Sequence, residues 1–150
     1  MHQITVQGHG APFFAHLEKL TTTINNRKID TQYSPRSVLT GSMKDHAIVI
    51  NKHISTISNT SSILTMISCY SAEGGRYSSA QYMADRLNTK VIGFKGKVNG
   101  TRTATSSCDS ESKTFTPQTS SLAKAITSIG YKVGYTYTKC RLYLKNQISR

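Results

Sequence analysis

The clearest hydrophobic pattern in the chain is the run ILTMI at residues 63–67, which is nearly continuous and ends at Ser68-Cys69. Such runs are typical of strands buried on both faces of a parallel sheet. Apolar residues then recur at helical spacing from about residue 78 to residue 87, and a serine at 78 or 79 can cap that helix. Residues 91–94 (VIGF) form a second apolar run. This order predicts a βαβ unit with parallel strands.

Two further patterns precede this unit. Residues 4–6 (ITV) are β-prone and run into Gly8-His9-Gly10, so we expect a short strand that ends in a tight turn at His9. Apolar residues at positions 13, 17, 20 and 24 recur at helical spacing after Pro12 and predict a helix that ends at Asn25-Asn26. Residues 27–46 are polar and indicate a loop, whereas residues 47–57 fit either a strand or a helix.

The C-terminal third begins with a polar stretch, residues 95–120, which we expect to form a hairpin or flap-like excursion. The apolar spacing of residues 122–129 predicts a short helix that Gly130 closes. Residues 131–137 then alternate tyrosine or valine with polar or small residues, as in a strand, and Cys140 continues the apolar alternation with leucines on the other parity. Residues 121–150 are therefore predicted to be a basic extension made of one short helix and strands.

The length of 150 residues suits one compact domain, and we predict a single α/β domain over residues 1–150 with a mainly parallel central sheet flanked by helices. No apolar run approaches the roughly 20 residues needed to cross a membrane, and the N-terminus lacks the pattern of a secretory signal peptide. The three cysteines, Cys69, Cys108 and Cys140, form no close pair and argue against a disulfide framework. A reducing compartment such as the cytoplasm fits this usage.

The net charge of +12 is unevenly distributed along the chain. Residues 1–85 hold 7 Lys or Arg and 5 Asp or Glu, whereas residues 86–150 hold 12 and 2. Such asymmetry indicates a polyanionic partner for the C-terminal half. Nucleic acid, an acidic membrane surface and a polyphosphate are open alternatives, beside a basic surface without a specific partner.

Two predicted strands end at reactive residues, the first at Gly8-His9-Gly10 and the second at Ser68-Cys69. Catalytic groups gather at the carboxyl edge of a parallel sheet, so two such strands would bring His9 and Cys69 together. A thiol is a strong nucleophile as the thiolate, and a nearby imidazole can take its proton. The backbone N–H groups of Gly10 and Cys69 could bind the oxyanion of a tetrahedral intermediate. The histidines and cysteines show no metal-site spacing, so no metal is predicted.

The segment Ile63-Leu64-Thr65-Met66-Ile67-Ser68-Cys69-Tyr70-Ser71-Ala72, together with the earlier His9-Gly10, resembles the clan CD cysteine peptidases. This caspase-like group includes the self-processing protease domains of bacterial toxins, and the bacterial toxin and effector branch is the most similar. The resemblance covers roughly residues 3–95. It implies a three-layer caspase-like fold, with His9 as general acid/base, Cys69 as nucleophile, and Gly10 and Cys69 as oxyanion donors. It departs from the group in having few residues before the His-Gly strand.

The resemblance also implies a biological setting and an activator. The setting is a bacterial toxin or effector protease that acts on a protein substrate, secreted without a signal peptide into a host cell. No cofactor is required, but toxin members are activated by inositol hexakisphosphate at a basic site near a β-flap. The basic residues that could serve here are Lys95, Lys97, Arg102, Lys132, Lys139, Arg141 and Lys145.

Three other interpretations stay open. A related acyl-transfer or deamidation enzyme would use the same dyad. A cysteine-dependent phosphatase would use Cys69 with Arg76 across a glycine-containing loop, although six residues separate them where such phosphatases have five, and Glu73 would repel phosphate. A non-catalytic module would bind nucleic acid or polyphosphate through tyrosines and basic residues interleaved over residues 131–145.

Overall fold

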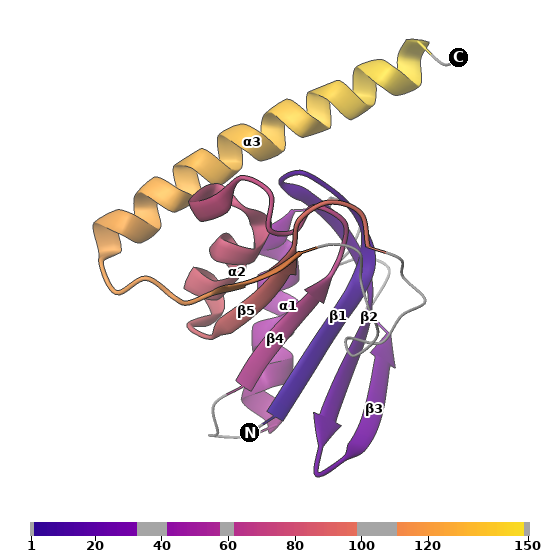
Figure 1. Ribbon diagram of the computed structural model, residues 1–150, viewed down its shortest axis with the longest axis vertical. Helices are drawn as coiled ribbons and strands as arrows, with labels where there is room; N and C mark the ends of the chain where they lie inside the picture. Colours follow the sequence, from indigo (N-terminus) through magenta and orange to yellow (C-terminus); the bar gives the residue numbers. More distant parts are fainter. Residues whose placement is uncertain (1, 33–41, 58–61, 99–110, 149–150) are drawn as a thin grey trace.

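The computed structural model describes residues 2–32, 42–57, 62–98 and 111–148 and contains a six-stranded sheet of order β3-β2-β1-β4-β5-β6 (Figure 1). The strands are β1 (His2–Ala11), β2 (Phe14–Ile24), β3 (Arg27–Gln32), β4 (Ser62–Ile67), β5 (Lys90–Phe94) and β6 (Ser112–Phe115). The helices are α1 (Met43–Ile57), α2 (Ser79–Leu87), α3 (Ser121–Ile148) and the 3-10 turn η2 (Gly75–Tyr77).

The sheet is mixed, so the prediction of an α/β fold is confirmed and that of a mainly parallel sheet is wrong. Strands β1, β4 and β5 run parallel, but the pairs β1/β2, β2/β3 and β5/β6 are antiparallel. The pairs β1/β2 and β2/β3 are antiparallel because short turns, which can join only antiparallel neighbours, connect the first three strands. The parallel centre follows from the crossovers through α1 and α2.

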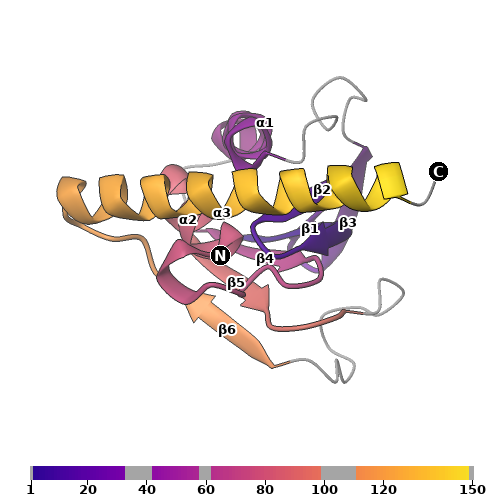
Figure 2. The same cartoon turned by 90° about the horizontal axis from the view of Figure 1, so that it is seen from above.

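Helices α1 and α2 lie on one face of the sheet, and α3 crosses the molecule at the end toward which β1 and β4 run (Figures 1 and 2). Within the described segments no helix covers the opposite face, so the three-layer caspase-like arrangement is not found there. On the helical face, Ile4 pairs with Leu64 and Val6 with Met66, and all four side chains are fully buried. These two cross-strand pairs form the centre of the hydrophobic core.

The segment predicted to be a helix after Pro12 is strand β2. Its pairing with β1 shifts between Gln7 and Gly8, where Gln7 faces Lys19 and Gly8 faces Leu17. Glu18 is therefore an extra residue, a β-bulge that changes which side chains point inward. Leu17 and Leu20 are both buried although they stand three positions apart. The bulge thus produces an apolar spacing that imitates a helix.

Asn25 and Asn26 form a hairpin turn and do not end a helix. Both have positive φ, 47° and 63°, as a two-residue turn that matches the twist of antiparallel strands requires. The chain continues as β3 where a loop was predicted. The undecided segment at residues 47–57 is the helix α1.

The predicted βαβ unit of β4, α2 and β5 is confirmed. The hydroxyl of Ser78 accepts the backbone N–H of Gln81 and caps α2, and Asn88 ends the helix in the left-handed conformation. β6 pairs with β5 in an antiparallel hairpin, in agreement with the expected excursion. Residues 99–110 of the predicted excursion lie outside the described residues.

Residues 121–148 form one long helix, so the predicted short helix and C-terminal strands are wrong. Gly130 does not terminate α3, and the tyrosine alternation after it is helical. Two glycines of α3 instead meet aromatic rings of the body: a Cβ on Gly130 would overlap the ring of Tyr77, and one on Gly134 would lie 2.6 Å from the ring of Phe13. The Thr138 hydroxyl donates to the Pro12 carbonyl at 2.8 Å. None of the described helices combines the length and apolar character needed to cross a bilayer.

Candidate functional site

The pairing of β1 with β4 sets the relative position of His9 and Cys69. The two strands are parallel neighbours, and Gln7 lies opposite Ile67. The pairing ends there, because β4 stops at Ile67, and the chain beyond it turns so that Cys69 lies against Gly10, the residue after His9. His9 does not follow the strand as predicted, because β1 continues to Ala11 through its pairing with β2.

Gly10 lies against the backbone around Cys69. A Cβ built on Gly10 would overlap the Ser68 hydroxyl and lie 2.5 Å from the Cys69 carbonyl oxygen and 3.3 Å from its nitrogen. Real Cβ atoms do not approach backbone this closely, so the contact requires glycine here. The sequence His9-Gly10 is thereby explained in part by packing: the glycine allows the segment after β4 to lie against β1.

The Cys69 thiol is hydrogen-bonded to the backbone of Val98, which lies in the segment that follows β5. The N–H of Val98 donates to Sγ at 3.2 Å, and the thiol lies 3.5 Å from the Val98 carbonyl oxygen, to which it donates. The cysteine is half-buried. In the described residues no hydrogen bond or ion pair joins Cys69 to His9. The structure therefore brings the two residues to one edge without joining their side chains.

His9 is exposed and has a second histidine beside it. In the β1/β2 hairpin His9 pairs with His16, whose Nε2 lies 3.6 Å from an oxygen of Glu18. The helix predicted for this segment would have separated the two residues, and the hairpin instead sets His16 next to His9 on the same face of the sheet. No sequence signal could have paired them, because the pairing depends on a turn at Pro12 and Phe13 that the helical spacing concealed.

The loop after Cys69 does not form a phosphate cradle. The N–H groups of Tyr70 and Ala72 donate to the carbonyls of Gly96 and Phe94 at 2.7 and 2.9 Å, which anchors this loop to the end of β5. The Arg76 guanidinium lies over the Tyr77 ring, 5.4 Å from its centre. A bound phosphate needs free N–H groups and an inward cation, so the phosphatase interpretation has no structural support.

Two other histidines have structural roles between α1 and β2. His46 is buried, with Nε2 3.1 Å from the Ala15 carbonyl oxygen, and burial lowers its pKa. His53 lies 2.8 Å from the Thr22 hydroxyl, and burial lowers its pKa as well. Across the described segments no group of three or more His, Cys, Asp or Glu is arranged to hold a metal ion.

The predicted anion-binding residues that the structure describes lie on two segments of the chain. Lys95 and Lys97 follow β5, and Lys95 pairs with Glu111 at 3.4 Å. The other described members of the set lie on α3, and Arg102 falls outside the described residues, as does Cys108. The α3 members are Lys132, Lys139, Arg141 and Lys145. Cys140, predicted to alternate with leucines along a strand, is exposed on the same helix.

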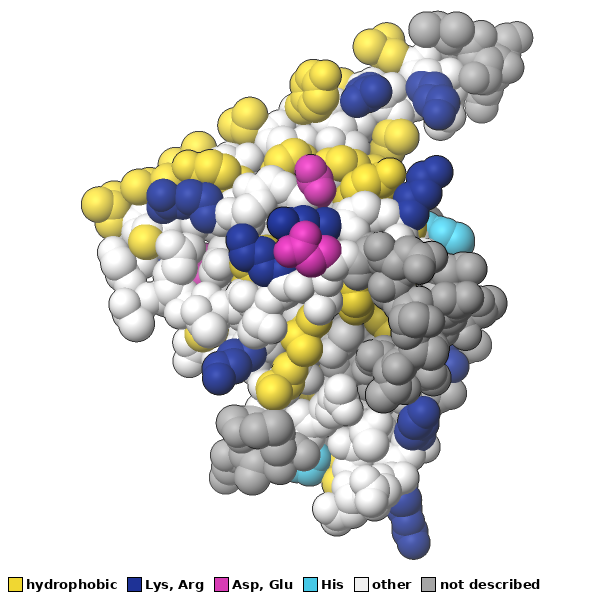
Figure 3. Space-filling view, in the orientation of Figure 1, with side chains coloured by type: hydrophobic (Ala, Val, Ile, Leu, Met, Phe, Trp, Pro, Cys, Tyr) yellow, Lys and Arg dark blue, Asp and Glu magenta, His cyan; other side chains and the backbone are white. Residues whose placement is uncertain are grey.

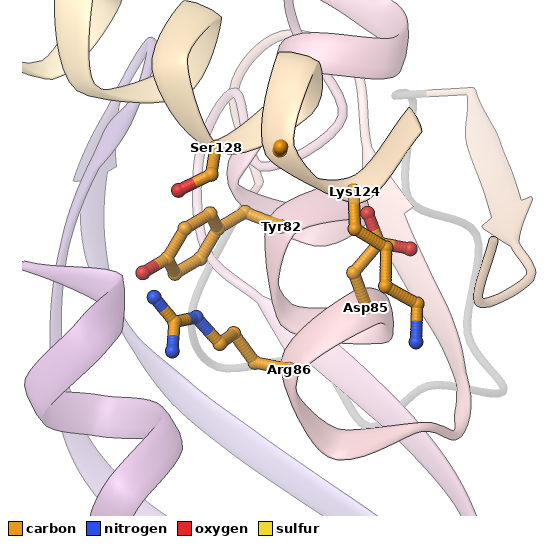
Figure 4. Close-up of a pocket in the computed structure, with 6 residues that line it drawn as sticks. Tyr82, Asp85, Arg86, Lys124 and Ser128 are labelled. Carbon is orange, nitrogen blue, oxygen red and sulfur yellow. The ribbon is translucent and has the colours of Figure 1, made fainter. Parts of the chain in front are cut away.

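A pocket of about 300 Å³ opens between α2 and α3 (Figure 4). The hydroxyls of Tyr82 and Ser128 and the Arg86 guanidinium point toward one end, and Lys124 and Asp85 lie at the other. The Arg86 guanidinium is 5.3 Å from the centre of the Tyr82 ring. No sequence pattern marked this pocket, because its lining comes from two helices that are far apart in the chain.

The chain matches the family described as "Secreted effector protein SteB" over residues 3–150. It belongs to the SteB family of secreted effectors. Proteins named secreted effector protein SteB from two strains of Salmonella typhimurium, 14028s and LT2, are each 34% identical to it over 115 residues. The alignment covers 77% of this chain and 70% of each relative. No solved structure matches. The SteB description names an effector but no reaction, and the resemblance to clan CD peptidases stays a prediction.

Proposed function

We propose that this SteB-family effector is a cysteine-dependent hydrolase that acts on a host protein, with Cys69 as nucleophile and His9 as general acid/base. The single observation that supports the proposal is the parallel pairing of β1 and β4, which runs the segments leading to His9 and Cys69 side by side toward one edge of the sheet. Carboxyl edges of parallel strands are where catalytic groups gather in open α/β sheets.

In the proposed reaction the Cys69 thiolate attacks the carbonyl carbon of the scissile amide, and its S–C bond forms as the carbonyl oxygen becomes an oxyanion. The N–H groups of Gly10 and Cys69 would bind that oxygen. His9 takes the thiol proton and delivers it to the leaving amine as the C–N bond breaks. Water, deprotonated by His9, then releases the acyl group. A peptide bond and a side-chain amide would both serve as substrate, so deamidation and acyl transfer use the same steps.

The Val98 contact gives the proposed enzyme a closed and an open form. Val98 presents one N–H and one C=O to the thiol, which are the groups that a substrate peptide would present. We infer that substrate displaces this segment, freeing Cys69 for His9. The thiol is only half-buried in the closed form, so we expect this segment to open without substrate as well and to admit a small reagent such as iodoacetamide.

The test is the rate of alkylation by iodoacetamide near pH 6, mapped to each cysteine by mass spectrometry. Exposed Cys140 serves as the internal reference thiol. We expect Cys69 to react faster than Cys140 and Cys108 in spite of its partial burial, and to slow on the order of tenfold in His9→Ala, because loss of the base lowers the thiolate fraction.

The matched control is His16→Ala, which removes the neighbouring histidine of the hairpin. This variant should leave the Cys69 rate unchanged if His9 is the partner. If Cys69 stays unreactive while Cys140 labels, or if His9→Ala has no effect, Cys69 is a structural cysteine held by Val98 and the hydrolase proposal is wrong.

A further inference from the structure

The outward side of α3 carries a row of exposed apolar side chains. They recur three or four positions apart and so lie along one face of the helix. Leu122 is 71% exposed, Val133 65% and Tyr137 66%. We call this row the outer stripe; its members are Leu122, Ile126, Ile129, Val133, Tyr137, Cys140 and Leu144. Figure 3 shows hydrophobic side chains following α3 along the edge of the molecule.

The outer stripe is distinct from the side of α3 that packs on the body. That side is formed by Thr127, Tyr131 and Thr138, all buried, together with glycines that admit the rings of the body. The helix thus has a narrow inner side rich in small and hydroxyl residues and a wider apolar side turned away from the protein. Single exposed apolar residues are ordinary, but a continuous row on one helix marks an interaction surface.

Basic residues border the outer stripe on both sides. By helical periodicity Lys132 and Lys139 lie along one flank, and Arg141 and Lys145 along the other. All four are exposed, and α3 contains no Asp or Glu. An apolar row between two cationic flanks is the pattern of helices that lie in the plane of a membrane surface.

We propose that α3 lays the outer stripe into the interfacial region of a bilayer that contains anionic lipids, with its basic flanks on the headgroups. The charge argues for this occupant over a second copy of the chain. Two α3 helices joined stripe to stripe would bring together flanks that are basic on both partners, with no carboxylate on either helix to offset them. An anionic lipid surface complements both flanks at once.

The shape of the molecule fits a flat partner. A helix of 28 residues is about 42 Å long, and α3 lies along the outside of the molecule and extends past the sheet (Figures 1 and 2). The outer stripe therefore faces away from the body over its length, and one plane can touch all of it. The residues of the proposed hydrolase site lie on β1 and directly after β4, not on α3. The two proposals are therefore tested independently.

The experiment is cosedimentation of the full chain with vesicles of phosphatidylcholine alone and of phosphatidylcholine mixed with phosphatidylserine in equal parts. We expect binding to the mixed vesicles that weakens with salt, and little binding to phosphatidylcholine alone. Replacing Ile129 and Val133 together by Ser should lower the binding constant on the order of tenfold or more, because the buried apolar area is lost. The matched control is Ile48→Ser, which alters an equally exposed isoleucine on α1.

Charge is tested by the double variant Lys132→Glu with Arg141→Glu, which alters both flanks. Each basic residue removed from an anionic surface lowers binding about fivefold, so this pair should reduce it by well over tenfold. Lys44→Glu with Lys52→Glu, on α1, is the matched control and should change binding much less. Equal binding to both vesicle types, no binding to either, or a dimer that the Ile129 and Val133 variant dissolves would overturn the proposal. The first result removes the role of charge, the second excludes a lipid surface as the partner of the outer stripe, and the third assigns the stripe to a second copy of the chain.

Discussion

The hydroxyl of Tyr131 accepts the backbone N–H of Met43 at 3.0 Å, across 88 positions of the chain. Met43 is the first residue of α1 and Tyr131 lies in the middle of α3, so this bond ties the long C-terminal helix to the start of another. Both residues are buried, and the Tyr131 ring stacks on Tyr82 of α2 with the ring centres 4.3 Å apart. Burial also raises the pKa of Tyr131, which stays a neutral hydroxyl at physiological pH. Tyr131 is thus the point at which the three helices meet.

The first prediction is that Tyr131→Phe destabilises the protein while leaving its ring packing in place. The change removes the acceptor of a buried N–H, which costs about 1–3 kcal/mol in the free energy of unfolding. Chemical denaturation followed by circular dichroism would measure it. The control is Tyr143→Phe on the same helix, where the tyrosine is 63% exposed and the change should be close to neutral. Equal stability of the two variants would mean that water satisfies the Met43 N–H.

Gly134→Ala should be destabilising although alanine is the better helix former. The added methyl would lie 2.6 Å from the Phe13 ring, so α3 must move away from the β1/β2 turn. Overpacking of this kind costs about 1–3 kcal/mol, which exceeds the gain of about 1 kcal/mol in helix propensity. Thr136→Ala, at an exposed position of α3, isolates the propensity effect and should be neutral or slightly stabilising. A rise in stability for Gly134→Ala would show that the contact is loose.

The same contacts explain why the C-terminal helix was not predicted from the sequence. Gly130 carries the signal of a helix end, and residues 131–137 carry the alternation of a strand, but both depend on partners far away in the chain. The glycines allow aromatic rings of the body to pack close to α3. Tyr131 and Tyr135 stand four positions apart, so on a helix they lie on the same side, which is the side that packs on the body. Local patterns cannot distinguish a glycine that ends a helix from one that allows close packing.

The N-terminal hairpin was missed for a related reason. Bulged Glu18 changes the side-chain parity of β2, so Leu17 and Leu20 have the spacing of a helix while lying on one face of a strand. By contrast, β4, α2 and β5 were predictable, because the apolar runs and the Ser78 cap are local signals. Their parallel order made it possible to expect His9 and Cys69 at one edge. The backbone of Val98 as partner of the thiol depends on a loop conformation that no pattern encodes.

Asp85 should prove to be a structural carboxylate of the α2–α3 interface. Its oxygens accept the backbone N–H and the side-chain amide of Gln118, both at 2.8 Å, and the amide of Gln81 at 3.0 Å. Asp85→Ala leaves these donors without an acceptor and should lower the free energy of unfolding by about 2–3 kcal/mol, as expected for hydrogen bonds to a charged group.

The control for this prediction is Asp85→Asn, which keeps one acceptor oxygen and nearly the same shape. It should lose less stability than the alanine variant in the same denaturation measurement. If the two variants have the same free energy of unfolding, the hydrogen bonds to Asp85 contribute little to stability. The carboxylate would then be solvated and could bind a ligand in the pocket beside it.

The last prediction concerns the stability of the protein in mild acid. Burial lowers the pKa of His46 below 6.5, opposed in part by its hydrogen bond with the Ala15 carbonyl. Below about pH 6.5 the unfolded chain therefore binds a proton at this histidine more readily than the folded protein does. The contribution of His46 to the free energy of unfolding is complete above that pH and is lost as the pH falls through the folded-state pKa. One such group gives a slope of at most about 1.4 kcal/mol per pH unit, and His53, whose pKa is also lowered, adds to it.

Urea denaturation at several pH values from 7 to 5, where most carboxylates stay charged, would measure this slope. The expected result is a decline in the free energy of unfolding from pH 7 to pH 5 that is shallower in His46→Gln, because glutamine can still donate to the Ala15 carbonyl but does not titrate. A decline that is the same in the original protein and in His46→Gln would place the acid sensitivity in other groups and show that the folded and unfolded states bind the His46 proton equally.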